Sequence, residues 1–106
     1  MNASEFLVRM AEIEVDPARL DEYRAAVNEE IEASVRSEPG VIALYAVQLK
    51  DNPVHIRIFE IYASKAAYEA HLETPHFRKY KTATQDMVKL LRLFDTIPIV
   101  LGAKSK

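Results

Sequence analysis

The sequence predicts an α+β protein of ferredoxin-like βαββαβ order, with a four-stranded antiparallel sheet and helices on one face. Two observations predict this fold: apolar runs of strand length alternate with helical stripes, and a turn in the middle of the chain marks a hairpin. Apolar residues also occupy both sides of the predicted strands, although helices in this order cover only one side. A second copy of the chain would cover the other side, so we expect a dimeric α+β barrel.

The first predicted strand covers residues 6–15, and a helix follows it. Asp16 is the expected N-cap of this helix and Pro17 its first residue. Its expected buried stripe recurs at helical spacing, at Leu20, Tyr23, Val27, Ile31 and Val35. Glu38-Pro39-Gly40 should end the helix, because proline cannot continue it and glycine permits the turn.

The second half of the chain begins with the hairpin. Strands over residues 41–50 and 55–62 should flank the turn Asp51-Asn52-Pro53. Ser64 is the expected cap of a short helix, and Thr74-Pro75 has the chemistry of a second helix start. The apolar stripe expected in this helical region comprises Phe77, Tyr80, Thr84, Met87, Val88 and Leu91.

One domain is expected for the 106 residues, with an ordered core over about 6–101. The last strand is expected over about 93–101, where Pro98 favours a sheet edge or a bulge. Residues 102–106 are expected to form a frayed tail.

Composition excludes several classes of function. The chain has 14 basic and 16 acidic residues, interspersed along its length, whereas nucleic-acid binding needs a concentrated basic surface. It has no cysteine, which removes disulfides, cysteine-ligated zinc, iron–sulfur clusters and thiol nucleophiles. It lacks a long apolar run and the pattern of a signal peptide, so we expect a cytoplasmic protein that does not bind membranes.

Two histidines are the first candidates for chemistry. His71 shares a helical face with Tyr68 and Leu72, and we interpret it as a general base or substrate-binding group, the catalytic candidate. Its position in a last helical turn favours the charged imidazolium, whereas His76 lies in a first turn that favours the neutral form. The alternatives are a buried His71 bound to a backbone carbonyl and a solvent-facing His76. The spacing of His71 and His76 does not match that of the two histidines of a zinc-binding helix, and no metal is expected.

The remaining candidates would bind substrate. Glu60 and Tyr62 are two residues apart on a strand, so their side chains share one face. Tyr62, Tyr68 and Phe77 would line the cavity, although each is equally an ordinary core aromatic. Glu60 would need a partner if buried, and Arg9, Arg57 and Tyr80 are the candidates. A structural ion pair is the alternative role for Glu60.

The run from Glu60 to Tyr80, EIYASKAAYEAHLETPHFRKY, resembles the antibiotic biosynthesis monooxygenase family, and its AHLETPH portion resembles the quinol monooxygenase branch. Glu38-Pro39-Gly40 resembles the E-x-G turn of that family, and the likeness extends from Phe6 to about Leu101. It implies a homodimeric barrel that oxidises a small phenolic or quinol-type compound with O₂ and needs no cofactor. A base, His71 for preference, would remove a phenolic proton, and the anion would then reduce O₂.

Three alternative functions are considered for this fold. Haem degradation within the family uses an Asn, a Trp and an axial His, and the matching positions here look to be Ala11, His71 and Lys81, which argues against it. Isomerisation of a phosphorylated metabolite would need a phosphate-binding cluster that the sequence does not offer. A non-catalytic binding or stress-response module is the third alternative, since one fold supports many functions.

Overall fold

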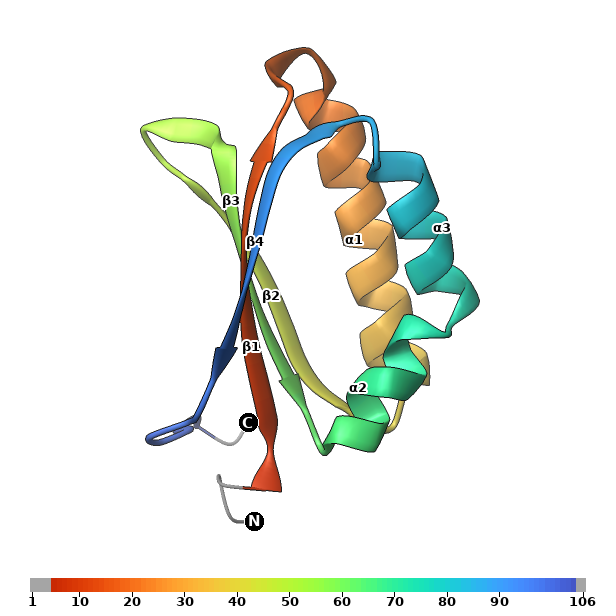
Figure 1. Cartoon of the computed structure of the whole chain (residues 1–106), viewed down its shortest axis with the longest axis vertical. Helices are drawn as coiled ribbons and strands as arrows, with labels where there is room; N and C mark the ends of the chain where they lie inside the picture. Colours follow the sequence, from red (N-terminus) through yellow and green to blue (C-terminus); the bar gives the residue numbers. More distant parts are fainter. Residues whose placement is uncertain (1–4, 105–106) are drawn as a thin grey trace.

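The computed structural model describes residues 5–104, and within them it confirms the α+β prediction. One four-stranded sheet carries the α-helices on a single face (Figure 1). The elements are β1 (Leu7–Val15), a 3₁₀ turn (Pro17–Arg19), α1 (Leu20–Ser37), β2 (Val41–Leu49), β3 (Asn52–Tyr62), α2 (Lys65–Leu72), α3 (Pro75–Thr84) and β4 (Val88–Thr96).

The sheet has the strand order β2-β3-β1-β4, and every neighbouring pair is antiparallel. This is the ferredoxin-like arrangement: β1 and β3 lie in the centre, and the helical crossovers place β2 and β4 at the edges. Ala11 of β1 lies opposite Ile58 of β3 and Leu93 of β4, so these three side chains share the helix-facing side. The register therefore assigns each strand residue to one face.

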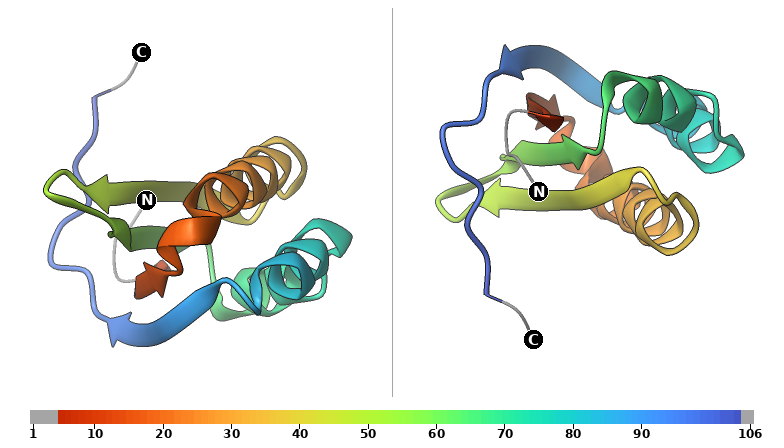
Figure 2. Two further views of the ribbon diagram at one scale, coloured as in Figure 1. Left: turned by 90° about the horizontal axis from the view of Figure 1, so that it is seen from above. Right: turned by 90° about the horizontal axis from the view of Figure 1, so that it is seen from below.

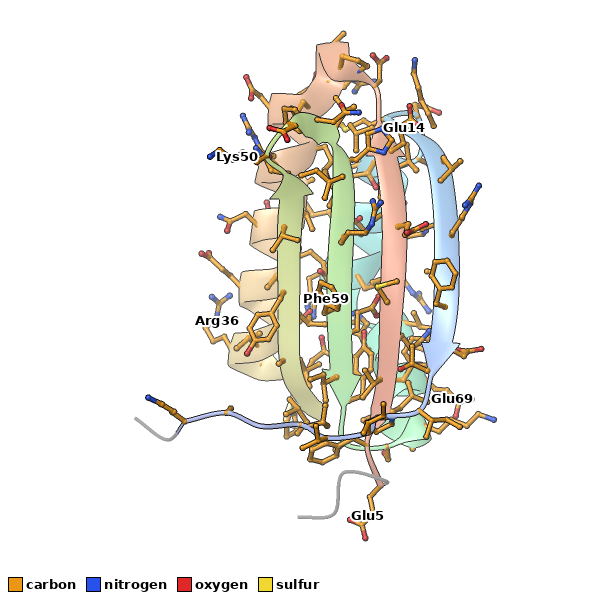
Figure 3. The ribbon with its side chains drawn as sticks, turned by 90° about the vertical axis from the view of Figure 1, so that its left-hand side faces the viewer. Glu5, Glu14, Arg36, Lys50, Phe59 and Glu69 are labelled. Carbon is orange, nitrogen blue, oxygen red and sulfur yellow. The ribbon has the colours of Figure 1, made fainter. Side chains whose placement is uncertain are left out.

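The core lies between the sheet and the helices. Buried strand residues, among them Ile13, Val15 and Ile56, pack there against Tyr23 and Val27 of α1. The other face of the sheet has no covering element in the described part of the chain (Figures 2 and 3). Its apolar side chains are exposed; they include Tyr45, Val47, Phe59, Leu90 and Phe94.

Three strand boundaries differ from the prediction by several residues. The last strand begins at Val88, about five residues before the predicted start, because α3 ends at Thr84 and a short turn follows, in which the Met87 amide donates to the Thr84 carbonyl. The strand ends at Thr96, so Pro98 lies beyond it and has no place in the sheet. Asn52 and Pro53 belong to β3 rather than to the turn. Ser105 and Lys106 of the predicted tail lie outside the described residues.

The predicted stripe of α1 is correct from Leu20 to Ile31, which pack against the core, and it fails at Val35. Tyr23 and Val27 are buried, but Val35 is 54% exposed, and the buried positions continue at Glu30 and Ser34. Spacings of 4, 3 and 4 residues still describe one helical face. The stripe prediction failed because it followed hydrophobicity, whereas this helix turns two polar side chains inward over a polar site.

Gly40 is required by a close approach rather than by its backbone angle. No glycine in the described residues has a positive φ, but a Cβ on Gly40 would lie 2.5 Å from Cβ of Ala67 on α2. The Gly40 carbonyl also accepts a 2.8 Å hydrogen bond from the Ala63 amide. The turn after α1 therefore packs directly against α2, which positions the two elements relative to each other.

Substituting Gly40→Ala should destabilise the protein by about 1–3 kcal/mol, the usual cost of overpacking. Chemical denaturation measures this difference. Gly102→Ala is the matched control, because nothing lies within 4 Å of a Cβ at that position. Equal stability of the two variants would contradict the close-packing explanation.

No helix among residues 5–104 is both long enough and apolar enough to cross a bilayer.

Candidate functional site

Helix caps position the two candidate histidines, as predicted. The Ser64 hydroxyl accepts from the Ala67 amide at 3.1 Å and begins α2. The Thr74 hydroxyl accepts from the Phe77 amide at 3.3 Å, and it donates to the His71 carbonyl at 2.8 Å. Thr74 thus ends one helix and begins the next, which places His71 and His76 on either side of the break.

Glu38 joins the two histidines in one hydrogen-bonded cluster. Its carboxylate accepts from His71 Nδ1 at 3.0 Å and from His76 Nε2 at 2.6 Å. The other ring nitrogen of His71, Nε2, lies 3.3 Å from Oε1 of Glu30, which also accepts from the Ser34 hydroxyl at 3.0 Å. The His71 ring is therefore held between two carboxyl groups, with its Nδ1 proton directed at Glu38.

The pKa values of Glu30 and Glu38 are shifted in opposite directions. Burial raises the pKa of Glu30, and its favourable interaction with His71 only partly opposes this effect. Burial would also raise the pKa of Glu38, but the hydrogen bonds from His76 and His71 outweigh it, so that pKa is lowered. Glu38 is therefore the more acidic group of the cluster, while Glu30 is the group that more readily holds a proton.

A cavity of about 100 Å³ lies between the sheet and the helices, on the Glu30 side of His71. Residues from all four strands and all three α-helices contribute to its wall. Its lining includes Arg9, Glu30, Glu60, Tyr62, Tyr68, His71, Phe77, Tyr80 and Lys81. Such a mixture of aromatic walls and a few polar groups is typical of sites that bind small molecules.

Aromatic rings surround His71 on the cavity side. The Phe77 ring centroid is 4.9 Å from that of His71, and the Tyr62 centroid is 5.3 Å from it. Tyr62 and Tyr68 meet edge to face at 5.2 Å. The Tyr62 hydroxyl donates to Glu60 at 2.6 Å, and burial together with the Glu60 charge raises the Tyr62 pKa, so that this phenol stays protonated.

The structure brings together five of the six predicted site residues, because Glu60, Tyr62, Tyr68, His71 and Phe77 all line the cavity. His76 is not among the lining residues and contacts Glu38 behind His71 instead. The partner of Glu60 is Tyr62 rather than Arg9, Arg57 or Tyr80. Arg57 lies on the opposite face, 3.3 Å from Glu12.

Three site residues were not found from the sequence: Glu30, Ser34 and Glu38. The available signal was the pair of polar residues at buried helical spacing on α1, Glu30 and Ser34, which continue the face of Tyr23 and Val27. Glu38 had been interpreted only as part of a turn. Its role depends on contacts with residues 33 and 38 positions later, which no local pattern contains.

Glu38, His71 and His76 are also the described residues best placed to hold a metal ion. Their donor atoms all lie within 4.8 Å of one another, and a carboxylate with two imidazoles suits divalent transition metals. The separations of 2.6 and 3.0 Å are those of charge-assisted hydrogen bonds, which account for the geometry of the cluster.

Residues 6–83 match the family model described as antibiotic biosynthesis monooxygenase. The chain belongs to the antibiotic biosynthesis monooxygenase family. The matched region contains Glu30, Glu38 and both histidines of the cluster, and it leaves out β4.

Solved structures agree with the family assignment. A candidate antibiotic biosynthesis monooxygenase from Bacteroides thetaiotaomicron is 52% identical, with a TM-score of 0.93 over 99% of this chain and 100% of that one. A candidate monooxygenase from Lactobacillus acidophilus is 33% identical, with a TM-score of 0.83 over 85% of this chain but only 43% of its own.

An uncharacterised protein of Synechocystis is 32% identical over 88 residues, which is 81% of this chain. The chain spans 58% of the length of that relative. The family and its fold are therefore shown for this chain.

Proposed function

We propose that this protein is a cofactor-independent monooxygenase that oxidises a small phenolic or quinol-type aromatic compound with O₂. The observation that carries the proposal is the Glu38–His71 hydrogen bond at the wall of an aromatic-lined cavity. A carboxylate that fixes one nitrogen of an imidazole as a donor leaves the other nitrogen to exchange a proton with substrate. The AHLETPH run, residues 70–76, supports the quinol-type substrate by resemblance.

The proposed first step is removal of a phenolic proton. With its Nδ1 proton bound to Glu38, His71 would accept the substrate proton at Nε2, on the side of Glu30. Glu30 can share that proton, because burial raises its pKa and makes it a better proton acceptor than an exposed carboxyl group. Glu38, as the anion, stabilises the imidazolium formed.

The second step is oxidation of the substrate anion by O₂. For an anthrone-type substrate, a methylene carbon becomes a carbonyl: one oxygen atom enters the product, and the other leaves as water with the two hydrogens. All four electrons come from the substrate. The protein's part is to bind the anion and to exclude water, which the enclosure by Tyr62, Tyr68 and Phe77 supports.

Oxygen consumption by the purified protein with a panel of hydroquinones and anthrones tests the proposal. We expect uptake of O₂ above the autoxidation rate for at least one member, with no added flavin or metal. If no member of the panel is turned over, the monooxygenase proposal is wrong for these substrate classes, and the non-catalytic binding alternative gains support.

We also propose that the protein is a homodimer whose interface is the open face of the sheet. This face comprises the outward side chains of all four strands, with an ionic centre where Glu12 lies 3.3 Å from Arg57 and 4.0 Å from Arg92. Tyr45 and Phe59 on this face are 61% and 41% exposed. An apolar surface of this extent on a sheet favours a partner, and a second copy of the chain offers the same surface.

The segment after β4 supports the same interface. It passes the ends of the strands on the open side of the sheet (Figures 2 and 3). Ile97, Ile99 and Val100 in this segment are 89%, 97% and 75% exposed. Three apolar side chains so exposed would be stabilised by contact with a second subunit.

Sedimentation of the wild type should give twice the chain mass of 12.1 kDa. Phe59→Glu should shift the mass towards that of a monomer, because it places a charge in the centre of the apolar face. Arg36→Glu changes charge on the exposed surface of α1 and should leave the dimer intact. A monomeric wild type at micromolar concentration would contradict the dimer.

A further inference from the structure

Arg9 is a charged residue of the cavity wall that the proposed reaction has not used. It projects from β1 towards the helices, and its side chain is only 15% exposed. Its guanidinium carbon lies 4.7 Å from the centroid of the Tyr68 ring, a cation–π distance. This contact holds the guanidinium against the aromatic wall of the cavity, where a ligand would meet its N–H groups.

One N–H donor of Arg9, that of Nε, is not used within residues 5–104. Its Nε is buried and has no hydrogen-bond partner among residues 5–104. Asp95 forms an ion pair with Arg9, but its Oδ1 lies 3.5 Å from Nε, longer than a usual hydrogen bond, and its side chain is 88% exposed to water, so the pair contributes little. Buried donors in folded proteins are usually satisfied, so this donor, on a residue of the cavity wall, is available to a ligand group.

The other charged groups of the cavity do not neutralise Arg9. Glu60 lies opposite Arg9 on β3, but its carboxylate accepts from Tyr62, and no ion pair between Glu60 and Arg9 is present in the described residues. Glu30 on α1 lies at His71 instead. Lys81 on α3 adds a second positive charge to the wall.

We propose that Arg9 binds the anionic oxygen of an aromatic ligand in this cavity. The proposal rests on the proposed function for the identity of the ligand as a phenol, and it assigns Arg9 to the phenolate that His71 would generate. A guanidinium suits this role because its planar donors stay charged at all relevant pH values and approach an oxygen from a fixed direction. Arg9 would thus favour substrates that are, or become, anions.

Binding of 4-nitrophenol tests this assignment without any turnover. At mildly alkaline pH the probe is ionised, and its absorbance reports binding directly; 4-nitroanisole, which cannot ionise, is the neutral analogue. We expect the wild type to bind the phenolate more tightly than the ether. Arg9→Gln should reduce that preference by about 10- to 100-fold, the range that corresponds to hydrogen bonds with charged groups. Arg9→Lys should retain part of it.

Two matched variants and a folding control complete the experiment. Arg36→Gln removes a cation from the exposed end of α1 and should leave the preference unchanged. Lys81→Gln should have a smaller effect than Arg9→Gln. Circular dichroism melting of each variant shows that it is folded, so that a lost preference is not lost structure.

Three results would overturn the proposal. One is an equal loss of phenolate and ether binding in Arg9→Gln, which would make Arg9 a packing residue. Another is a preference for the phenolate that is lost in Lys81→Gln but kept in Arg9→Gln. The third is a wild type that binds neither probe. If the phenolate binds through Arg9 but no quinol or anthrone consumes O₂, the anion site stands and the proposed monooxygenase function fails.

Discussion

Glu38→Gln should lower the free energy of unfolding by about 3 kcal/mol at neutral pH, in the range found when one member of a buried ion pair is removed. Glu38 accepts from both His71 and His76, and an amide oxygen cannot replace the charge that stabilises those two donors. Urea denaturation followed by circular dichroism measures the loss.

The pH dependence of this loss follows from the lowered pKa of Glu38. A carboxyl group whose pKa is lower in the folded protein stabilises it above the unfolded value of about 4.5, and the stabilisation disappears as pH falls through the folded pKa. The difference between wild type and Glu38→Gln should therefore be large at neutral pH and shrink in acid. A difference that does not change with pH would contradict the charged role of Glu38.

Glu30→Gln is the matched comparison, and its effect on the free energy of unfolding should change with pH in the opposite direction. The pKa of Glu30 is raised, so ionising it costs folded stability as pH rises from about 4.5 through the folded pKa. Replacing it removes that cost while keeping an oxygen for the Ser34 hydroxyl. The variant should gain stability relative to wild type as pH increases, whereas Glu38→Gln should lose it.

His71→Gln should lower the rate of O₂ consumption, with the best substrate of the panel, by about 100- to 10 000-fold, the usual contribution of a general base. Glutamine can still contact Glu38, but it cannot accept a proton at neutral pH. The loss should appear mainly in kcat, because Tyr62, Tyr68 and Phe77 still form the binding walls. Steady-state oxygen-electrode kinetics separates kcat from KM.

His76→Gln is the control of the same residue type. His76 contacts Glu38 but does not line the cavity, so its loss should lower kcat by less than His71→Gln does. If His71→Gln turns over at the wild-type rate, His71 is not the base. If His76→Gln is impaired as severely, the assignment to His71 alone is wrong.

Local chemistry explains which parts of the fold were predictable. Ser64 and Thr74 cap helices through bonds to residues three positions later, and the sequence contains both partners of each bond. The start of β4 was misplaced because Thr84, Met87, Val88 and Leu91 also fit a helical spacing. Pairing with β1 decides between the two patterns, and that pairing joins opposite ends of the chain.

The site was predictable only in part, because some of its residues are distant from one another in the sequence. His71 and its aromatic neighbours lie within one short stretch of sequence, which makes them recognisable as a group. Glu30 and Glu38 contribute from α1 and the turn after it, and only the folded chain shows that they enclose His71. A polar residue on a buried helical stripe is the signal that could have identified Glu30.

Glu38 is far in the sequence from the two histidines that it binds, and this determines when the cluster can form as the protein is made. Glu38 must close loops of 33 and 38 residues to reach His71 and His76. As the chain leaves the ribosome, the side chains of Glu30 and Glu38 emerge first and stay hydrated until α2 and α3 have been synthesised. A nascent chain that ends before residue 71 therefore has no cluster to form, and the proton-handling centre is completed only late in folding.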